Sequence, residues 1–291
     1  MRVATFNIDS LDMPPKAAVA LEHRIPILRP QLERVRADIL CLQEVNAQHV
    51  AGLAGRELLA LDKLLAGTRY EGYARAVSSV PGDARRVADV HNLVTLSRWP
   101  IRDVRSIRND RVPPLRYRPV TAAGAAAQEI AFERPILVAD IALPRGGLVT
   151  VVNLHLRAPL AAPVAGQKIA PFVWKSVDGW AEGYAIAAWK RTAQALEARL
   201  LVDDLMDAHP GRLLVVAGDF NAEDHETPLK ILVGAEEDTG NGLLAERSLV
   251  VLARSLPADR RFSILYHGRH QMVDHILVNA AALAHFRTLE V

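Results

Sequence analysis

The stretch Val215–Asp224, VVAGDFNAED, is an apolar run that stops at a glycine and continues with an acid and an amide. A β-strand presents alternate side chains to opposite faces, so Asp219 and Asn221 lie on the same side. A strand that belongs to the core by its composition therefore ends in two polar groups that point together. Other strands of the chain are needed to show whether these groups form a turn or a site.

The composition describes a globular protein. The chain has 291 residues, of which half are hydrophobic, so one large domain or two small ones with a sizeable core is expected. A net charge of +2 does not by itself indicate a nucleic-acid binder. The only cysteine, Cys41, excludes an intrachain disulfide and a cysteine-rich zinc cluster. Because neither a signal peptide nor a membrane-length apolar run is visible, a cytoplasmic location is expected.

Strand and helix patterns alternate from one end of the chain to the other. Apolar residues at every second position or in short runs predict strands, and apolar residues three or four apart predict helices. Strands are expected at 2–8, 38–45, 92–101, 135–143, 147–156, 212–220 and 272–279, and helices at 26–37, 49–67 and 185–209. This alternation favours a single α/β domain over residues 1–291 with buried sheets.

Two segments differ from this pattern. Residues 102–118 contain six arginines among prolines, which fits either a grip on a phosphate backbone or a solvated edge strand. Residues 157–184 form a long segment without periodicity that includes Trp174 and Trp180. Its aromatic rings could stack on bases, cover a lipid headgroup or pack on the surface. Arg191 and Gln194, on the helix that follows, are expected to be surface residues.

Several predicted strands carry polar residues at or near their C-terminal ends, as residues 215–224 do. These residues are Asn7, Asp9, Glu44, Asn153, His155 and Asp274, and the last lies in the apolar segment MVDHILV. An acid inside an apolar strand is costly without a partner. If the strand ends converge, the side chains form a polar pocket on a hydrophobic floor.

These residue types suit the hydrolysis of a phosphate ester. Mg²⁺ prefers oxygen ligands, so Asn7 and Glu44 could hold it, with Asp9 at a second position and Mn²⁺ as a substitute. The ion would neutralise charge on the phosphoryl oxygens. Attack by water requires a base, and Asp219 is the candidate.

The remaining polar residues have matching roles. Asn221 would donate to the phosphate or hold the water, and His155 would donate to a phosphoryl oxygen or protonate the leaving oxygen. Asp274 would orient His155 and keep its charge. Asn153, Arg134, Trp174 and Trp180 are further candidates for contacts with the substrate. Each residue alone also has a structural explanation, such as a turn or a strand-end hydrogen bond, so the prediction depends on the joint pattern.

At this point the chain resembles the endonuclease/exonuclease/phosphatase family with the DNase I-like fold. The segments TFNID, ADILCLQEV, HNLVTLSRWPI, VVNLHL, VVAGDFNAED and MVDHILV occur in that family's order and span residues 1–280. The resemblance implies a four-layer α/β/β/α sandwich and divalent-metal-dependent cleavage of phosphoester bonds. It implies metal ligation by Asn7, Glu44 and in some members Asp9, a catalytic role for His155, water and phosphate contacts for Asp219 and Asn221, and Asp274 as the partner of His155.

One departure concerns the end of the sequence. The family usually closes with a Ser-Asp-His-x-Pro segment, whereas the late Asp-His pair here, Asp274–His275, lies in a predicted strand and has no following proline. We expect the closing segment to lie beyond a truncated end. Two alternatives remain open: the protein lacks this segment, or Asp274–His275 has taken its role.

The sequence therefore predicts a Mg²⁺-dependent phosphodiesterase, with a nuclease favoured and nucleic acid as a possible partner. A phosphatase or phosphodiesterase for a lipid or small phosphoester is an alternative, and so is a non-catalytic binding relative. A serine hydrolase is disfavoured because no G-x-S-x-G occurs, and a Rossmann or kinase fold because no glycine-rich loop follows the first strand. A monomer is favoured, although nothing in the sequence defines the oligomeric state.

Overall fold

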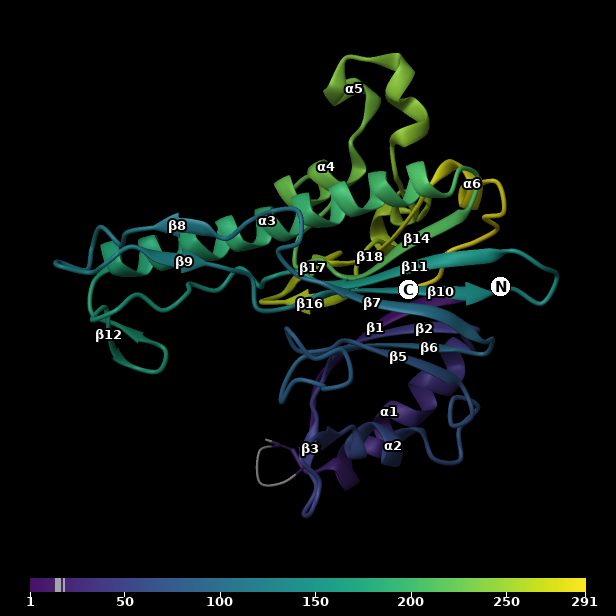
Figure 1. The fold of residues 1–291 in the computed structure, drawn as a ribbon, viewed down its shortest axis with the longest axis horizontal. Coiled ribbons are helices and arrows are strands. Elements are labelled where there is room, and N and C mark those ends of the chain that lie inside the picture. Colours follow the sequence, from purple (N-terminus) through teal and green to yellow (C-terminus); the bar gives the residue numbers. More distant parts are fainter. Residues whose placement is uncertain (14–16, 18) are drawn as a thin grey trace.

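Two β-sheets packed face to face form the centre of the molecule (Figure 1). The structure is a computed structural model that describes residues 1–13, 17 and 19–291. The smaller sheet has the strand order β1 (Val3–Leu11), β2 (Ile39–Val45), β6 (Asn92–Ser97) and β5 (Ala74–Val77). The larger sheet has the order β15 (Val250–Val251), β18 (Asp274–Val278), β14 (Leu213–Asp219), β11 (Leu148–His155), β10 (Ile136–Ala142) and β7 (Ile101–Ile107).

Helices cover the outer face of each sheet, so the molecule has four layers (Figure 1). Helices α1 (Leu21–Val35) and α2 (Leu59–Leu65) cover the smaller sheet, and α3 (Val177–Ala208) and α4 (Thr227–Val233) cover the larger one. The α/β/β/α sandwich implied by the family resemblance is thereby confirmed. Short helices α5 (Glu236–Thr239) and α6 (Ala280–Leu283) and the 3₁₀ turns η1 (Gly242–Arg247), η2 (Leu252–Ser255) and η3 (Ala258–Arg260) lie in the C-terminal part.

Alternation along β11 shows how the layers arise. Val149 and Val151 pack between the two sheets, whereas Val152 and Leu154 pack against the outer helical layer. All four side chains are buried, because this strand has a sheet on one side and helix α3 on the other. A strand buried on both faces favours apolar residues on both sides, and the polar residues of β11, such as Asn153, need buried hydrogen-bond partners.

Two predicted helices have other boundaries in the structure. The helix expected at 26–37 begins at Leu21, and the helix expected at 49–67 is shortened to α2. A hairpin of β3 (Gln48–His49) and β4 (Arg56–Glu57) occupies the earlier part of this second segment. Gly52 lies in the hairpin at a φ of 84°, a conformation that ends a helix and that glycine adopts readily.

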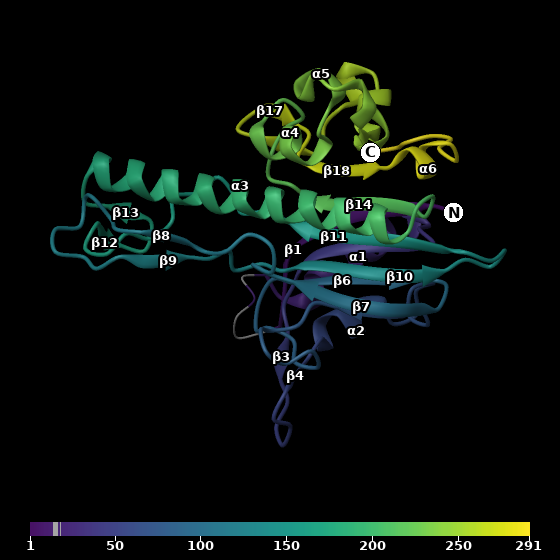
Figure 2. The same ribbon diagram turned by 45° about the horizontal axis from the view of Figure 1, so that its top comes forward.

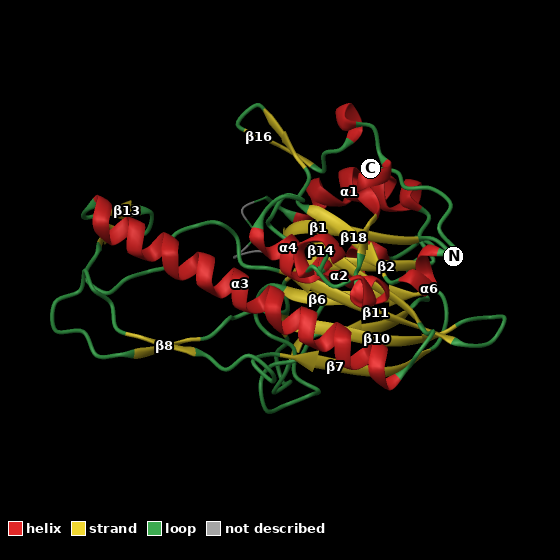
Figure 3. Ribbon diagram, turned by 90° about the horizontal axis from the view of Figure 1, so that it is seen from above, coloured by secondary structure: helices red, strands yellow, loops and turns green. Residues whose placement is uncertain are grey.

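An arm, formed by residues 113–132 and 158–190, projects from the sandwich (Figure 3). It contains the N-terminal half of α3 and two short hairpins, β8 (Leu115–Tyr117) with β9 (Gln128–Ile130) and β12 (Lys168–Ala170) with β13 (Val173–Trp174). A small separate core holds it together, formed by Ile130, Ala162, Val164, Ile186 and Ala187. Helix α3 thus begins well before residue 185, where the sequence pattern placed its start. None of the helices in the described residues combines the length and apolar character needed to cross a membrane.

The arginine-rich segment 102–118 divides between the sheet and the base of the arm. Its first part forms β7 at the edge of the larger sheet, where Arg105 pairs with Asp103 at 2.9 Å. Arg111 pairs with Asp204 of α3 at 2.7 Å. The segment is therefore not one continuous cationic surface. A last hairpin, β16 (Ile264–Tyr266) with β17 (Arg269–Gln271), precedes β18.

Candidate active site

Three polar residues form a row across neighbouring strands of the larger sheet. The register pairs His155 of β11 with Asp219 of β14, and Asp219 with Asp274 of β18. Strands β11 and β14 are parallel and end here, whereas β18 is antiparallel and begins here. Asp274 is therefore the N-terminal residue of its strand, and the expectation that it lies near the C-terminal end of a strand is wrong. The reversed direction of β18 brings that start to the same edge.

Gly218 allows this row to form. It has a φ of 151°, and a Cβ atom built on it would lie 1.9 Å from the carbonyl oxygen of Leu154 in β11. Only a residue without a side chain tolerates that approach of the two strands. The glycine before Asp219 is therefore required for the contact between Asp219 and His155.

Asn7 joins the two sheets at this edge. Its Nδ2 donates to Asp219 Oδ2 at 2.9 Å and to Glu44 Oε1 at 3.2 Å. The second carboxylate oxygen of Glu44 accepts from the Ser10 amide at 3.1 Å and from the Ser10 hydroxyl at 2.9 Å. One amide group thus lies between two carboxylates from different sheets.

The backbone at this edge is held in an unusual conformation. Five non-glycine residues have φ values in the left-handed region: Asp9 (52°), Ser10 (50°), Glu44 (61°), His91 (59°) and Asn221 (47°). Such residues cost conformational energy and persist where the surroundings fix them, often at functional sites. For Glu44 the turn coincides with an irregularity in the pairing of β2 with β6 between Leu42 and Val45. This irregularity directs Glu44 toward Asn7.

His155 is buried next to both carboxylates. Its Nε2 lies 3.4 Å from Asp219 Oδ2 and 3.7 Å from Glu44 Oε1. Burial lowers the pKa of His155 well below its ordinary value, and the charges of Arg134 and His91 lower it further. The imidazole is therefore neutral at neutral pH and can donate one hydrogen bond toward the site.

The two aspartates of the row affect each other's ionisation, because the register places Asp274 beside Asp219. Burial raises the pKa of Asp219, and burial together with the charge of Asp219 raises the pKa of Asp274 to about 7. Two carboxyl groups this close do not both ionise easily, so near neutral pH they titrate as a pair. Asp274 Oδ1 is buried and has no hydrogen-bond partner among the described residues.

The predicted contact between Asp274 and His155 is wrong. The carboxylates within 4 Å of His155 are those of Glu44 and Asp219, and Nδ1 of His155 has no hydrogen-bond partner in the described part of the chain. Because β14 lies between β11 and β18, Asp219 occupies the space through which Asp274 would have to reach.

Asn221 is fixed by the middle of α3. Its backbone amide donates to Asp219 Oδ1 at 2.8 Å, and its Nδ2 donates to the Leu156 carbonyl at 3.1 Å. Arg191 of α3 donates to the Asn221 carbonyl at 3.1 Å, and Gln194 accepts from the Arg157 amide at 2.8 Å. Both α3 residues are buried, so the expectation that they are surface residues is wrong.

The sequence profile described as Endonuclease/Exonuclease/phosphatase family matches residues 4–291. The chain belongs to this family. Its members are hydrolases of phosphoester bonds and generally use divalent metals. A search of curated protein sequences gave no significant match.

Solved structures of this family share the fold at low sequence identity. A truncated Caenorhabditis elegans TDP2 is 16% identical, with a TM-score of 0.52, over 95% of this chain and 83% of that one. The mannosyl-6-phosphatase Bt3783 of Bacteroides thetaiotaomicron is 14% identical, with a TM-score of 0.55, over 96% and 85%. The human Nocturnin catalytic domain with bound sulfate is 18% identical, with a TM-score of 0.51, over 94% and 81%.

The residues at the edge fit a hard divalent cation of the kind that this family uses. No group of three His, Cys, Asp or Glu residues in the described ranges is arranged to hold a metal alone. Mg²⁺ does not require such a group, because one or two carboxylates with water and substrate oxygens are typical. Glu44 offers oxygen ligands, and the adjacent carboxylate of Asp219 favours a positive ion. At Asn7 the NH₂ group faces these carboxylates and Oδ1 accepts from the Asp9 amide, so metal ligation by Asn7 requires its amide to turn.

Asp9 and Arg134 both lie at this edge. Asp9 is exposed, and its backbone amide donates to Asn7 Oδ1 at 2.9 Å. That bond turns the Asn7 NH₂ group toward the carboxylates. Arg134 donates to the Leu156 carbonyl at 2.9 Å, and it lies just before β10, whose start is at the same edge.

Other predicted substrate contacts are placed elsewhere by the structure. Asn153 is fully buried between the sheets, where it accepts from Gln43 Nε2 at 2.8 Å, and its Nδ2 donates to the Val94 carbonyl at 3.2 Å. It cannot reach a substrate, so that prediction is wrong. Trp174 lies in β13, which is at the far end of the arm (Figure 2), and packs against the small core there. Trp180, on the first turns of α3, has its ring tilted against that of Tyr184, with the ring centres 5.4 Å apart.

His91 is a site residue that the sequence analysis missed. Its ring is parallel to that of His155 with the ring centres 6.4 Å apart, and its Nδ1 lies 3.0 Å from Arg134 Nη2. The signal in the sequence is a histidine directly before the strand predicted at 92–101. An antiparallel strand brings its start to the edge where its parallel neighbours end.

His275, the alternative source of a catalytic histidine, faces the other way. It is buried, its Nε2 lies 2.9 Å from the Ala222 carbonyl oxygen, and its ring meets the edge of Phe220. The possibility that the Asp274–His275 pair supplies an imidazole to the phosphate is therefore excluded by the alternation of β18.

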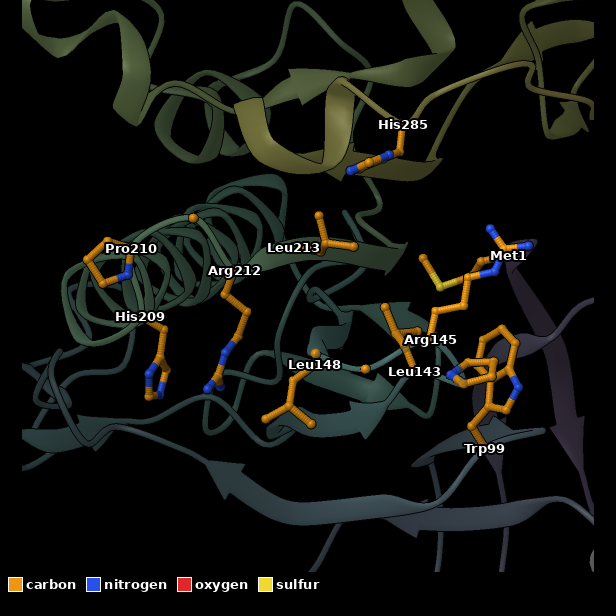
Figure 4. Close-up of a pocket in the computed structure, with 14 residues that line it drawn as sticks. Met1, Trp99, Leu143, Arg145, Leu148, His209, Pro210, Arg212, Leu213 and His285 are labelled. Carbon is orange, nitrogen blue, oxygen red and sulfur yellow. The ribbon is translucent and has the colours of Figure 1, made fainter.

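A wide hollow of about 1090 Å³ lies at the opposite end of the sandwich (Figure 4). Leu148 and Leu213, which begin β11 and β14, line it together with Trp99 and His285. The row of His155, Asp219 and Asp274 lies where these same strands end. The hollow is therefore separate from the candidate active site.

Proposed function

We propose that the chain hydrolyses phosphodiester bonds in a reaction that depends on a divalent metal, with nucleic acid or a nucleotide as the favoured class of substrate. The observation that carries this proposal is the row His155–Asp219–Asp274, which faces Asn7 and Glu44 from the other sheet. Residues suited to a metal, a base and a neutral hydrogen-bond donor thus meet at one edge.

The residues that would bind the metal differ from the residue that would act as the base. Asn7 and Glu44, with Asp9 beside them, would hold Mg²⁺ or Mn²⁺, and the bound ion would neutralise charge on the phosphoryl oxygens. Asp219 would take the proton of the attacking water. Its two oxygens accept from Asn7 and Asn221, which fixes the carboxylate in one orientation.

The other two residues of the row would handle the phosphate and the leaving group. His155 is neutral, so it would donate a hydrogen bond to a phosphoryl oxygen. Asp274 has a pKa of about 7 because it is buried beside Asp219, so it holds a proton in part of the molecules at neutral pH. That proton is available for the leaving oxygen.

A lipid phosphoester is a second candidate, favoured by the apolar surface of the arm. Phe172 is 92% exposed, Val177 82% and Ile169 73%. Exposed apolar groups gathered in this way suit contact with a partner or a lipid surface. With a lipid substrate, the residues of the row would have the same roles in phosphoester hydrolysis.

The test is hydrolysis of bis(4-nitrophenyl) phosphate, a diester, and 4-nitrophenyl phosphate, a monoester. We expect Mg²⁺-dependent cleavage of the diester that EDTA abolishes and added Mg²⁺ or Mn²⁺ restores. Asp219→Ala should lower kcat by about 10² or more, because it removes the base. The matched control Asp259→Ala changes an exposed aspartate and should retain activity.

Two outcomes would contradict the proposal. Turnover that survives EDTA would exclude the metal dependence, and turnover that survives Asp219→Ala would exclude the assigned base. Metal binding without turnover of either ester would identify a non-catalytic member of the family.

A further inference from the structure

A second polar cavity adjoins the catalytic row. We call it the arginine pocket: a cavity of about 380 Å³ lined by His91, Arg108, Arg134 and Arg157 together with residues 78–80. Arg157 follows the end of β11, Arg134 precedes β10 and Arg108 follows the end of β7. Since these three strands are successive neighbours with alternating direction, all three arginines lie at the edge that carries the row.

The three arginines of the pocket outnumber its two acidic lining residues, Asp89 and Glu133, and the charge of Glu133 acts on both Arg108 and Arg157. Of its acidic lining residues, Glu133 pairs with Lys190, and Asp89 pairs with Arg56 at 2.9 Å. Within the described part of the chain, the side chains of Arg108 and Arg157 have no hydrogen-bond or ion-pair partner, and the Nε of each is buried. Buried guanidinium donors without acceptors are costly, so an anion in the pocket would satisfy them.

The remaining polar lining also donates. Arginine has no acceptor, so the contact between Arg134 Nη2 and His91 Nδ1 fixes Nδ1 as the acceptor. The proton of the neutral His91 imidazole is then on Nε2, which makes this atom a donor. A cavity whose charged and polar groups are mainly donors selects an anion.

The distance to the row is short. His91 lines the pocket, and its ring lies parallel to that of His155 at 6.4 Å. A phosphate at His155 and an anion at Arg108 and Arg157 would therefore both lie near His91. The cavity lies within the range of about 300–1,000 Å³ of small-molecule sites, so it has room for the group that carries the anion.

The geometry points to a subsite in the arginine pocket for a second, non-scissile phosphate group of the substrate. This inference rests on the proposed function, since the scissile diester is taken to bind at the row. It specifies the substrate as a phosphodiester whose sugar-sized group carries a further phosphate. The same donors would also bind free phosphate, so the test separates the two sources.

The test compares two substrates with the same scissile bond: thymidine 5′-(4-nitrophenyl phosphate) and its 3′-phosphorylated form. We expect kcat/KM to be about tenfold or more higher for the 3′-phosphorylated compound, mainly through KM, because charge-assisted hydrogen bonds are strong. Arg108→Gln and Arg157→Gln should each reduce this ratio toward one. Both variants should keep kcat/KM for the unphosphorylated compound within about threefold.

The control variant is Arg102→Gln, which changes an exposed arginine of β7 outside the pocket. It should leave the preference for the 3′-phosphate unchanged. An equal kcat/KM for the two substrates in the native chain would overturn the inference. So would a preference that survives in the Arg108→Gln, Arg157→Gln double variant.

Binding without turnover provides the second measurement. In EDTA, calorimetric titration should show thymidine 3′,5′-bisphosphate binding about tenfold more tightly than thymidine 5′-monophosphate or inorganic phosphate, and the double variant should lose this difference. If inorganic phosphate alone binds as tightly as the bisphosphate, the site is for a free anion and the inference is wrong. If binding shows the preference but neither ester is cleaved, the subsite stands and the proposed function fails.

Discussion

At the scale of single residues, Gly218 determines whether the row of His155, Asp219 and Asp274 can form. The carbonyl of Leu154 occupies the space that any side chain at this position would need. The apolar run before Asp219 can pair with β11 only because its last residue has no Cβ atom. The position of Asp219 thus depends on the close approach of the preceding residue, Gly218, to the Leu154 carbonyl.

Gly218→Ala should be strongly destabilising. A Cβ atom 1.9 Å from a carbonyl oxygen forces β14 away from β11, so we expect a loss of about 3 kcal/mol or more, or failure to fold. Gly72→Ala is the control, because nothing lies within 4 Å of its Cβ position. Urea denaturation measures both, and equal stabilities of the two variants would show that the strands do not approach as described.

Asp274, whose ionisation is linked to that of Asp219, contributes to the pH dependence of stability. Its pKa is about 7 in the folded chain against an ordinary value of 3.8. The native state therefore binds this proton more tightly than the unfolded state, so the contribution is full below pH 3.8 and is lost as the pH rises to 7. Replacing the Asp274 carboxyl by a group that does not ionise should therefore prevent this loss of stability at high pH.

Asp274→Asn should therefore be more stable than the native chain at pH 8, by on the order of 2–4 kcal/mol, and similar to it at pH 4. Buried histidines with a lowered pKa change the stability in the opposite direction as the pH rises. The measurement is therefore the difference between the unfolding free energies of the native chain and of the variant, taken at each pH in EDTA, because the histidine contribution cancels in it. Asp259→Asn, an exposed carboxyl, is the control. A difference that does not change between pH 4 and 8 would contradict the assignment.

At the scale of elements, helix α3 connects the arm to the active site. Two buried glutamates of α3 hold residues 110–121 against the helix. Glu182 accepts from Tyr117 Oη at 2.7 Å and from the Thr121 amide at 3.0 Å. Glu197 accepts from the Asp110 and Arg111 amides, both at 3.1 Å. The middle of the same helix fixes Asn221 through Arg191. Acids on a helix usually face water, so the sequence pattern gave no sign of this packing.

Glu182→Gln should loosen the arm and leave the sandwich intact. The hydrogen bonds to Glu182 lower its pKa to about 2, which shows that they favour the carboxylate, and an amide cannot accept from all of the donors. We expect faster limited proteolysis within residues 113–132 and unchanged cleavage of bis(4-nitrophenyl) phosphate. Glu129→Gln, an exposed change in β9, should leave proteolysis as in the native chain. Equal proteolysis of the two variants would show that Glu182 does not hold the arm.

At the scale of the whole molecule, the two sheets meet through an apolar layer with a polar bridge inside it. Asn153 of the larger sheet and Gln43 of the smaller sheet bond to each other, and both are fully buried. A buried polar pair of this kind fixes how one sheet lies on the other, because each group must find its partner. The alignment of the sheets in turn places Asn7 opposite Asp219.

Asn153→Ala tests whether Asn153 stabilises the fold or contacts the substrate. Loss of the acceptor leaves Gln43 buried without its partner, so we expect about 1–3 kcal/mol lower stability. KM for the diester should remain within about twofold. Gln128→Ala, an exposed amide change, is the control and should affect neither quantity. A raised KM at native stability would restore the prediction that Asn153 contacts the substrate.

The sequence by itself determined an α/β domain with buried sheets and most of the residues at the edge of the candidate site, and the resemblance to the family supplied the sandwich. Runs of apolar residues specify strands buried on both faces, and polar residues at their ends become visible because they interrupt these runs. Asn7, Glu44, His155 and Asp219 could therefore be predicted. These signals are local, since each depends on a few neighbouring residues.

Only the tertiary structure decided which residues meet. The place of Asp274 beside Asp219, the burial of Asn153, Arg191 and Gln194, and the gathering of three arginines around His91 depend on strand order, strand direction and the packing of α3. These are relations between segments far apart in the chain. Periodicity reports the face on which a side chain lies, but the partner on that face is fixed only when the sheets and helices pack together.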